Sequence, residues 1–275
     1  MTPGSPPSLA RCTDGDLAWH TDPALLERHG VLVAFSERTG GMSAPPFASL
    51  DLAANAGDDP AAVDENRDRL LAALGLGADR ERLTCAEQVH GARVAEVTPS
   101  EAGSGAQASP GGRPPMPATD AILTAQPHVP LLMCYADCVP VVMAATEPVR
   151  AVAVVHSGWR GSLARIAGAA ATALAERAGC ETSGLVAYIG PYICSECYPM
   201  SGDLLWRFEA EFGTLPVARG RLDLGAVVSG SLRDAGVPIE HQIQLGACTA
   251  ECTDRFYSYR TEGVTGRHGA LAVVL

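Results

Sequence analysis

The sequence predicts a mixed α/β fold, because short apolar runs alternate with helical patterns along most of its 275 residues. Residues 121–155 contain four such runs separated by proline or charged residues, a pattern typical of strands buried on both faces of a sheet. An alanine-rich helical segment follows them. Apolar residues make up 47% of the chain, enough for a sizeable core. Neither a Rossmann nor a P-loop glycine pattern accompanies these elements.

The N-terminal half is expected to hold a first strand at 31–35, after a polar, proline-rich leader. Asp58-Asp59-Pro60 is a good helix start, because acids suit the positive end and proline fits the first turn. One apolar stripe continues that helix as far as Gly75, which ends it. Residues 83–97 indicate two strands flanking Gln88-Val-His-Gly91. The Gly-, Ser- and Pro-rich segment at about 99–118 is interpreted as a mobile surface insertion.

The C-terminal half predicts a run of strands followed by helices. A helix over 162–178 is expected to be capped by Ser162 and stopped by Gly179. Further helices are expected at 204–212 and 222–232. The expected strands are 121–124, 129–135, 139–144, 149–155, 185–189, 243–246, 256–259 and 270–275.

The charge balance excludes several classes of partner. With 31 acidic and 20 basic residues the formal net charge is −11, so the surface repels nucleic acid and anionic membranes. Every basic residue is arginine, which excludes lysine Schiff-base chemistry and a P-loop lysine. Nine cysteines without an export signal at the start predict a reducing, cytoplasmic location. Monomer and homodimer are both compatible with these features.

Three short segments each place a metal ligand beside a turn residue at the end of an apolar run. They carry His90, Cys138 and His156. Two imidazoles and one thiolate suit Zn²⁺, and three protein ligands leave a fourth position for water or substrate, as in catalytic zinc sites. The separations of 48 and 18 residues match no local metal motif, and each residue could instead be a packed thiol or a capping histidine.

A second group of cysteines has zinc-like spacing. Cys194-Ser-Glu-Cys197 and Cys248-Thr-Ala-Glu-Cys252 could together form a structural Cys₄ site. Free buried thiols are the commoner outcome for such residues, so both interpretations stay open.

The chain resembles the laccase-domain family, also labelled multicopper polyphenol oxidoreductases and described as purine nucleoside phosphorylases. The resemblance spans nearly the whole sequence and depends on an ordered series of motifs. These are Thr39-Gly-Gly-Met-Ser43, Ser49-Leu-Asp-Leu52, Gly57-Asp-Asp-Pro60, Glu65-Asn-Arg67, Gln88-Val-His-Gly91, Asp120-Ala121, Ala136-Asp-Cys-Val-Pro140, His156-Ser-Gly-Trp-Arg-Gly161, Ile189-Gly-Pro191, Cys248-Thr249, Phe256-Tyr-Ser-Tyr-Arg260 and Thr265-Gly-Arg267.

The resemblance implies one domain over 1–275, with helices outside two internal sheets in an α/β/β/α arrangement. It implies a single zinc ion on His90, Cys138 and His156. It also implies phosphorolysis of adenosine, inosine and methylthioadenosine, with adenosine deamination as a second activity. Asp51 departs from the family pattern, which usually has Asn there.

Other site residues are hypotheses from residue chemistry. Asp137 is the candidate acid or base beside Cys138, although a turn-capping role is equally compatible. Arg67 and Arg160 are candidates for binding phosphate through a bidentate fork, with a solvated or structural charge as the alternative for each. Ser43 and Gln88 are expected as polar contacts in the site.

Three rival functions are weighed against the phosphorylase. One is a hydrolase or editing factor acting on peptidoglycan precursors through Cys138 as nucleophile. Another is a binding module whose metal only organises the fold. The third, a copper-dependent polyphenol oxidase, is disfavoured because four-copper sites need His-x-His pairs and about ten histidines. The chain has seven histidines and no such pair, so zinc is favoured over copper.

Overall fold

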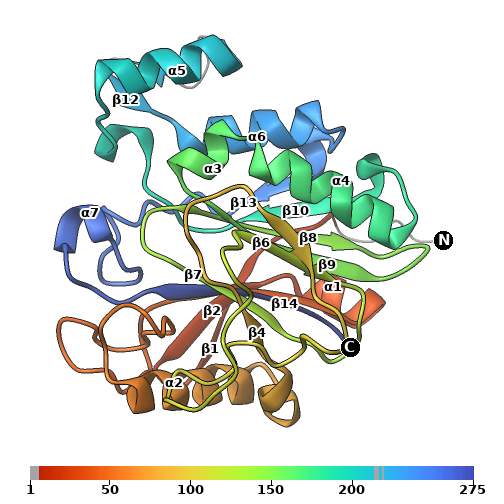
Figure 1. The fold of residues 1–275 in the computed structure, drawn as a ribbon, viewed down its shortest axis with the longest axis vertical. Coiled ribbons are helices and arrows are strands. Elements are labelled where there is room, and N and C mark those ends of the chain that lie inside the picture. The colour runs from red at the N-terminus through yellow and green to blue at the C-terminus, as the bar shows by residue number, and fades with distance from the viewer. Residues whose placement is uncertain (1–5, 214–216, 219) are drawn as a thin grey trace.

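The computed structural model describes residues 6–213, 217–218 and 220–275, and it shows two six-stranded sheets packed face to face (Figure 1). In the first sheet, strands β1 to β3 form antiparallel pairs, β14 lies between β3 and β7, and β4 adds a parallel edge. Its order is β1 (Ala10–Asp14), β2 (Leu17–Thr21), β3 (Val31–Ser36), β14 (His268–Val274), β7 (Leu131–Tyr135) and β4 (Thr84–Cys85).

The second sheet is antiparallel at its centre and has a parallel strand at each edge. Its order is β13 (Gln242–Gln244), β10 (Val186–Ile189), β8 (Val139–Ala145), β9 (Ala151–Ser157), β6 (Ala121–Thr124) and β5 (Val94–Glu96). A short hairpin of β11 (Val217–Ala218) and β12 (Arg221–Leu222) lies apart from both sheets.

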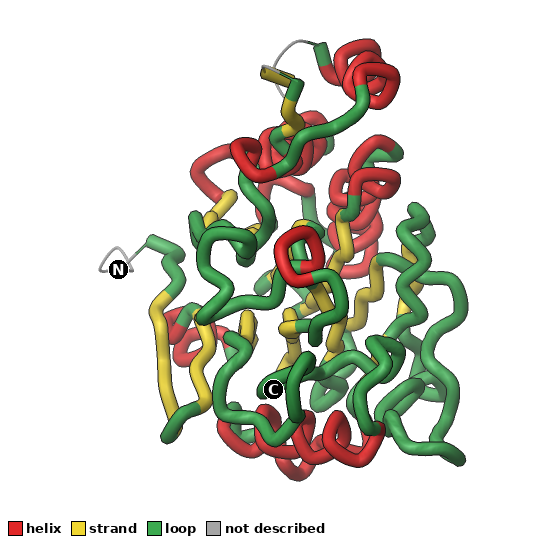
Figure 2. Tube along the Cα trace, turned by 90° about the vertical axis from the view of Figure 1, so that its left-hand side faces the viewer, coloured by secondary structure: helices red, strands yellow, loops and turns green. Residues whose placement is uncertain are grey.

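Helices cover the outer faces of the two sheets. Helix α2 (Pro60–Ala73) lies against the first sheet, and α4 (Ile166–Ala178) and α6 (Leu224–Asp234) lie against the second. Viewed from the side, helices lie above and below the strands (Figure 2). The remaining helices are α1 (Pro23–His29), α3 (Trp159–Leu163), α5 (Gly202–Phe212) and α7 (Tyr259–Glu262). The predicted α/β/β/α arrangement is therefore confirmed.

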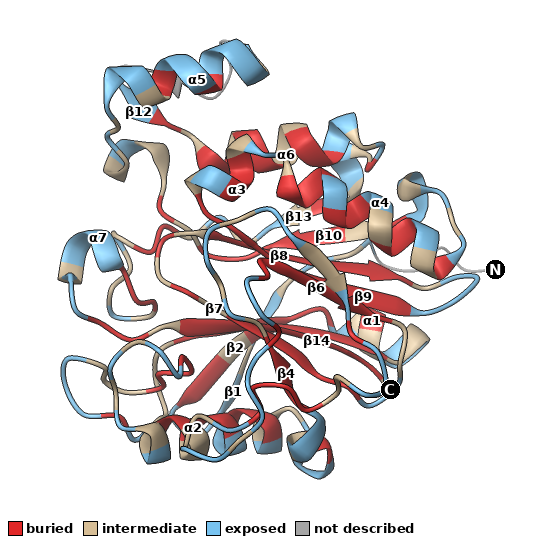
Figure 3. Cartoon of the chain, in the orientation of Figure 1, coloured by how far each residue is buried: buried red, intermediate tan, exposed pale blue. Residues whose placement is uncertain are grey.

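Strict alternation of side chains explains why the central strands contain no polar face. In β3, Val31, Val33 and Phe35 pack between the two sheets, whereas Leu32 and Ala34 pack toward α2. Since successive residues of a strand point to opposite faces, a strand covered on both sides must be apolar throughout. Figure 3 shows this burial along the central strands and exposed outer faces on the helices.

Most of the predicted elements are confirmed, including the start of α2. Asp59 caps that helix by accepting a hydrogen bond from the Ala61 amide, and Pro60 occupies its first position. Strands β3 to β10, β13 and β14 lie within a few residues of their expected ranges, as do α5 and α6. None of the helices among the described residues is long and apolar enough to cross a membrane.

Three expectations were wrong. The leader before residue 31 contains β1, β2 and α1, which went unpredicted because β1 is an exposed edge strand without apolar alternation. Residues 256–259 form no strand, and α7 begins at Tyr259. The helix expected over 162–178 is divided into α3 and α4 by Arg165, whose φ of 57° is left-handed. Ser162 caps neither helix, because its hydroxyl bonds Ser157.

The segment 99–118 has no helix or strand, but its middle is buried. Its carbonyl groups at Gly105 and Ala106 accept hydrogen bonds from Arg67 of α2, and the Ser104 carbonyl pairs with the Cys85 amide. The interpretation as a surface insertion is therefore corrected for residues 103–106, which pack against α2 and β4.

Candidate metal centre and its cavity

The three predicted ligands converge on one point. The Sγ atom of Cys138 lies 3.7 Å from Nε2 of His90, and one ligand atom from each of His90, Cys138 and His156 lies within 4.8 Å of the others. The two imidazole rings meet edge to face, with centroids 4.8 Å apart. Tetrahedral zinc, with bonds of about 2.0–2.3 Å, places neighbouring ligand atoms roughly 3.3–3.8 Å apart. The donor set and its spacing therefore fit one zinc ion.

Two of the ligands lie at strand ends, and the third lies in a loop. His156 lies near the end of β9, Cys138 immediately precedes β8, and His90 lies in the loop between β4 and β5. His90 and Asp137 have left-handed backbones, with φ of 59° and 86°. Non-glycine residues in this conformation cost free energy, and such positions concentrate at functional sites.

Asp120 connects two of the ligands, and sequence reasoning did not assign it a role. Its carboxylate accepts hydrogen bonds from the amides of Val89, His90 and Gly91. The same carboxylate lies 2.8 Å from Nδ1 of the buried His156 ring. This bond orients the ring so that Nε2 is left for the metal, as carboxylates commonly do for histidine ligands.

The site favours a thiolate at Cys138. Burial alone would raise the pKa of this thiol, but the charge of His156 and hydrogen bonds from both histidines lower it to about 6. Burial would likewise lower the pKa of His156, whereas the Cys138 thiolate and Asp120 raise it to about 9. Since a metal binds the thiolate form, this environment prepares Cys138 as a ligand.

The centre opens into a cavity of about 880 Å³. Its lining includes aromatic side chains and several arginines, a composition suited to a planar, partly anionic small molecule. Besides the three ligands, the lining residues that bear on function are Arg67, Gln88, Asp137, Trp159, Arg160, Tyr198, Tyr259, Arg260 and Arg267.

Two of the predicted site residues, Gln88 and Asp137, form hydrogen bonds that connect the segments lining this cavity. The Gln88 side-chain amide donates to the Cys134 carbonyl and accepts from the Cys134 amide, so it connects its loop to β7. Both carboxylate oxygens of Asp137 are engaged, one by the Thr249 hydroxyl and the other by the Arg260 amide. These bonds match the alternative in which Asp137 caps a turn.

The arginines differ in how much of each guanidinium is engaged. Arg67 is buried and donates four hydrogen bonds to the carbonyls of Leu52, Gly105 and Ala106. Arg160 is exposed and lies over the Trp159 ring at 4.4 Å, and Arg260 lies over the Tyr198 ring at 5.0 Å. Neither of these two guanidinium groups forms an ion pair within the described part of the chain. Binding of an anion therefore suits Arg160 better than Arg67.

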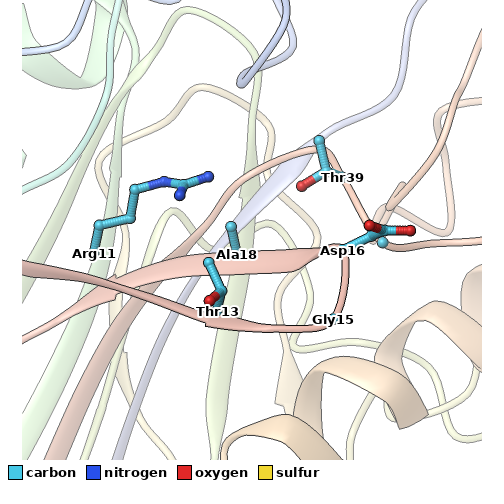
Figure 4. Close-up of a pocket in the computed structure, with 7 residues that line it drawn as sticks. Arg11, Thr13, Gly15, Asp16, Ala18 and Thr39 are labelled. Carbon is cyan, nitrogen blue, oxygen red and sulfur yellow. The ribbon is translucent and has the colours of Figure 1, made fainter.

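Ser43 is not brought to the site. It is buried, its hydroxyl accepts a hydrogen bond from the Asn66 side chain, and it is absent from the cavity lining. A second depression lies on the β1–β2 hairpin and includes Arg11, Thr13, Asp16 and Thr39 (Figure 4). It contains none of the predicted ligands, so the candidate metal centre lies in the larger cavity.

A side chain at Gly158 is expected to disturb the centre. A Cβ atom there would lie 2.7 Å from Cδ2 of His90 and 3.1 Å from Sγ of Cys138. Gly158→Ala is therefore expected to weaken zinc binding on the order of tenfold to a hundredfold, because two ligands must move. Competition with a fluorescent zinc chelator measures the change. Gly184→Ala, where the added Cβ contacts nothing, should bind as the wild type does, and equal affinities in the two variants would contradict the crowding argument.

The fold and the centre define a class of protein: an α/β/β/α sandwich with a His-Cys-His centre in a cavity lined by aromatic and charged side chains. The family described as multi-copper polyphenol oxidoreductase laccase matches residues 32–275, and the chain belongs to it.

Named relatives cover most of the chain. A protein of Streptomyces coelicolor, named purine nucleoside phosphorylase SCO2081, is 37% identical over 244 residues, which are 87% of this chain and 93% of that protein. Purine nucleoside phosphorylase YlmD of Geobacillus stearothermophilus is 35% identical, over 86% of this chain and 88% of its own.

Solved structures show the same architecture. The crystal structure of YlmD from G. stearothermophilus superposes with a TM-score of 0.86 at 31% identity, over 98% of this chain and 99% of the other. The structure of the hypothetical protein YfiH of Bacillus licheniformis gives 0.82 at 28% identity, over 95% and 97%.

Proposed function

We propose that the protein is a zinc-dependent purine nucleoside phosphorylase that cleaves adenosine, inosine and methylthioadenosine, with adenosine deamination as a side activity. The observation that carries the proposal is a three-ligand centre in a cavity lined by aromatic side chains and arginines. The names of two relatives, 37% and 35% identical, support the phosphorylase part of this proposal.

The reaction joins a phosphate oxygen to C1′ of the ribose while the bond from C1′ to the purine nitrogen breaks. The bonding electrons leave with the base, which takes up a proton, and the sugar leaves as its 1-phosphate. In this proposal Arg160 binds the phosphate dianion in the cavity, because this residue is exposed and forms no ion pair with a carboxylate among the described residues. Tyr198 and Trp159 offer aromatic faces to the purine.

His90, Cys138 and His156 would hold the zinc, and Asp120 orients His156 through its Nδ1 atom. When bound, zinc supplies a Lewis acid that can also activate water, the reagent that deamination requires. Asp137 acts in this proposal as a positioning residue, because its carboxylate fixes the loop that carries Arg260. Gln88 has the same kind of role toward β7.

Copper oxidase chemistry is less well supported. Two candidate metal clusters occur among the described residues, and together they contain only two histidines. Four copper ions need an imidazole-rich environment, which neither cluster offers.

The test is incubation of the zinc-loaded protein with adenosine, with and without phosphate, followed by identification of the products. Release of adenine that requires phosphate is the expected result, with a smaller phosphate-independent yield of inosine. Absence of both products refutes the proposal. Turnover by metal-free protein that thiol alkylation blocks would instead favour the hydrolase that uses Cys138.

Arg160→Ala is expected to raise the KM for phosphate about tenfold or more with a smaller effect on kcat, since a charge-assisted bidentate contact is lost. Initial rates at varied phosphate concentration measure this. Arg82→Ala is the matched control, because Arg82 is exposed outside the cavity lining. An unchanged KM in the Arg160 variant would remove this residue from the phosphate site.

A further inference from the structure

A second set of ligand atoms gathers away from the cavity. Cys194, Cys197, Cys248 and Glu251 each offer one atom, and these atoms lie within 4.8 Å of one another. The thiols of Cys194 and Cys197 are each 3.7 Å from Oε1 of Glu251. Tetrahedral zinc with three sulfur ligands and one oxygen ligand places such atoms roughly 3.5–3.8 Å apart. We propose that these four residues bind a second zinc ion, with a structural role.

The local backbone supports this geometry. Residues 195–197 form one turn of 3₁₀ helix, which brings Cys194 and Cys197 to the same side. The amide of Cys194 donates to Sγ of Cys248 at 3.3 Å, a contact that stabilises a thiolate ligand. Four protein ligands close the coordination sphere, which is the arrangement of structural zinc and leaves no position for substrate.

Cys252 is not part of this cluster, although it completes the expected spacing of cysteines. Its amide donates to the carbonyl of Cys248, so residues 248–252 turn as a single helical loop. The side chain of Glu251, one residue earlier, points toward the thiols instead. The ligand set is therefore three cysteines and one glutamate, and not four cysteines.

The second ion would connect two loops that form one wall of the cavity. Tyr192 and Cys248 are already paired as a short parallel bridge, and the Ile193 amide donates to the Asp137 carbonyl. Beyond the cluster, one loop continues to Tyr198 and the other to Arg260, whose guanidinium lies over the Tyr198 ring. Zinc at this position would fix both loops, and hence both side chains, without touching the substrate.

The test is the zinc content of the purified full-length chain after reduction and dialysis against zinc. Wild type is expected to retain two ions per chain. Cys194→Ser/Cys197→Ser should lose one of the two, and His90→Ala/His156→Ala should lose the other. Cys252→Ser is the matched control and should keep both. This readout does not depend on enzymatic activity, so failure of the proposed phosphorylase function would leave it unaffected.

A cobalt-substituted sample distinguishes the loss of a ligand from the misfolding of a variant. In His90→Ala/His156→Ala, which leaves the second cluster intact, thiolate-to-cobalt charge transfer should persist, and adding Glu251→Ala should shift its spectrum. One zinc ion per wild-type chain, lost entirely in the histidine variant, overturns the proposal. A disulfide between Cys194 and Cys197 in the zinc-treated wild-type protein would overturn it as well.

Discussion

Cys138→Ala and His156→Ala are each expected to remove the proposed zinc ion of the cavity and with it the proposed phosphorylase activity. Either change leaves two ligands, and two ligands hold zinc far more weakly than three. A bound metal contributes several kcal/mol to the transition state, so kcat/KM should fall on the order of 10³-fold. Zinc analysis and the adenosine assay measure the two effects on the same samples.

The fold is expected to survive both changes, because Asp120 still accepts hydrogen bonds from the amides of Val89, His90 and Gly91 after His156 is replaced. Circular dichroism and cooperative thermal unfolding check this point. Cys180→Ala is the matched control, because this thiol lies outside both metal clusters. Full activity together with retained zinc in either ligand variant would show that the centre lies elsewhere.

The positions of the ligands could be predicted from sequence because each follows a local rule. In the sequence His90, Cys138 and His156 follow apolar runs, and in the structure Cys138 and His156 lie at strand ends whereas His90 lies in the loop between β4 and β5. The family motifs then selected these three among seven histidines and nine cysteines. Asp120 matched a family motif as well, but nothing local relates it to ligands 30 and 36 residues away. Its role depends on the register of β6 beside β9, which only the folded chain shows.

The substrate contacts were harder to predict, because the charge of an arginine does not indicate its partners. Arg67 and Arg160 look alike in sequence and both line the cavity, yet Arg67 is buried and donates four hydrogen bonds to backbone carbonyls, whereas Arg160 is exposed. Ser43 lies in a matched motif, but its partner is Asn66. In the second cluster, the spacing of the cysteines predicted Cys252 as the fourth ligand. The 248–252 turn instead brings the carboxylate of Glu251 to the three thiols.

The buried carboxyl of Asp51 makes a separate prediction about stability. One oxygen accepts hydrogen bonds from the amides of Ala53 and Arg267, while the other has no partner among the described residues. Burial is the largest influence and raises the pKa of Asp51 to about 6, against an ordinary value of 3.8. The folded state therefore favours the protonated form, and ionising this group at higher pH costs folding free energy.

The sign of the pH dependence follows from the raised pKa. Well below pH 3.8 the carboxyl is protonated in folded and unfolded chains alike, so it contributes no penalty. As pH rises from about 3.8 to 6 the unfolded chain ionises first, and above the folded pKa the penalty is complete. A shift of about 2 units corresponds to roughly 2–3 kcal/mol. This group alone should therefore make the wild type less stable at pH 8 than at pH 4.5.

Asp51→Asn is expected to abolish this dependence. Its Oδ1 can accept the same two amides, and its neutral side chain carries no ionisation penalty, although its unpaired NH₂ offsets part of the gain. Relative to wild type, the free energy of unfolding should rise by about 1–3 kcal/mol between pH 4.5 and pH 8, measured by urea denaturation at both values. Asp14→Asn, an exposed carboxylate on β1, serves as the control and should show a much smaller change. If the difference between the Asp51 variant and wild type is the same at both pH values, the carboxyl is already ionised in the folded protein and the assignment fails.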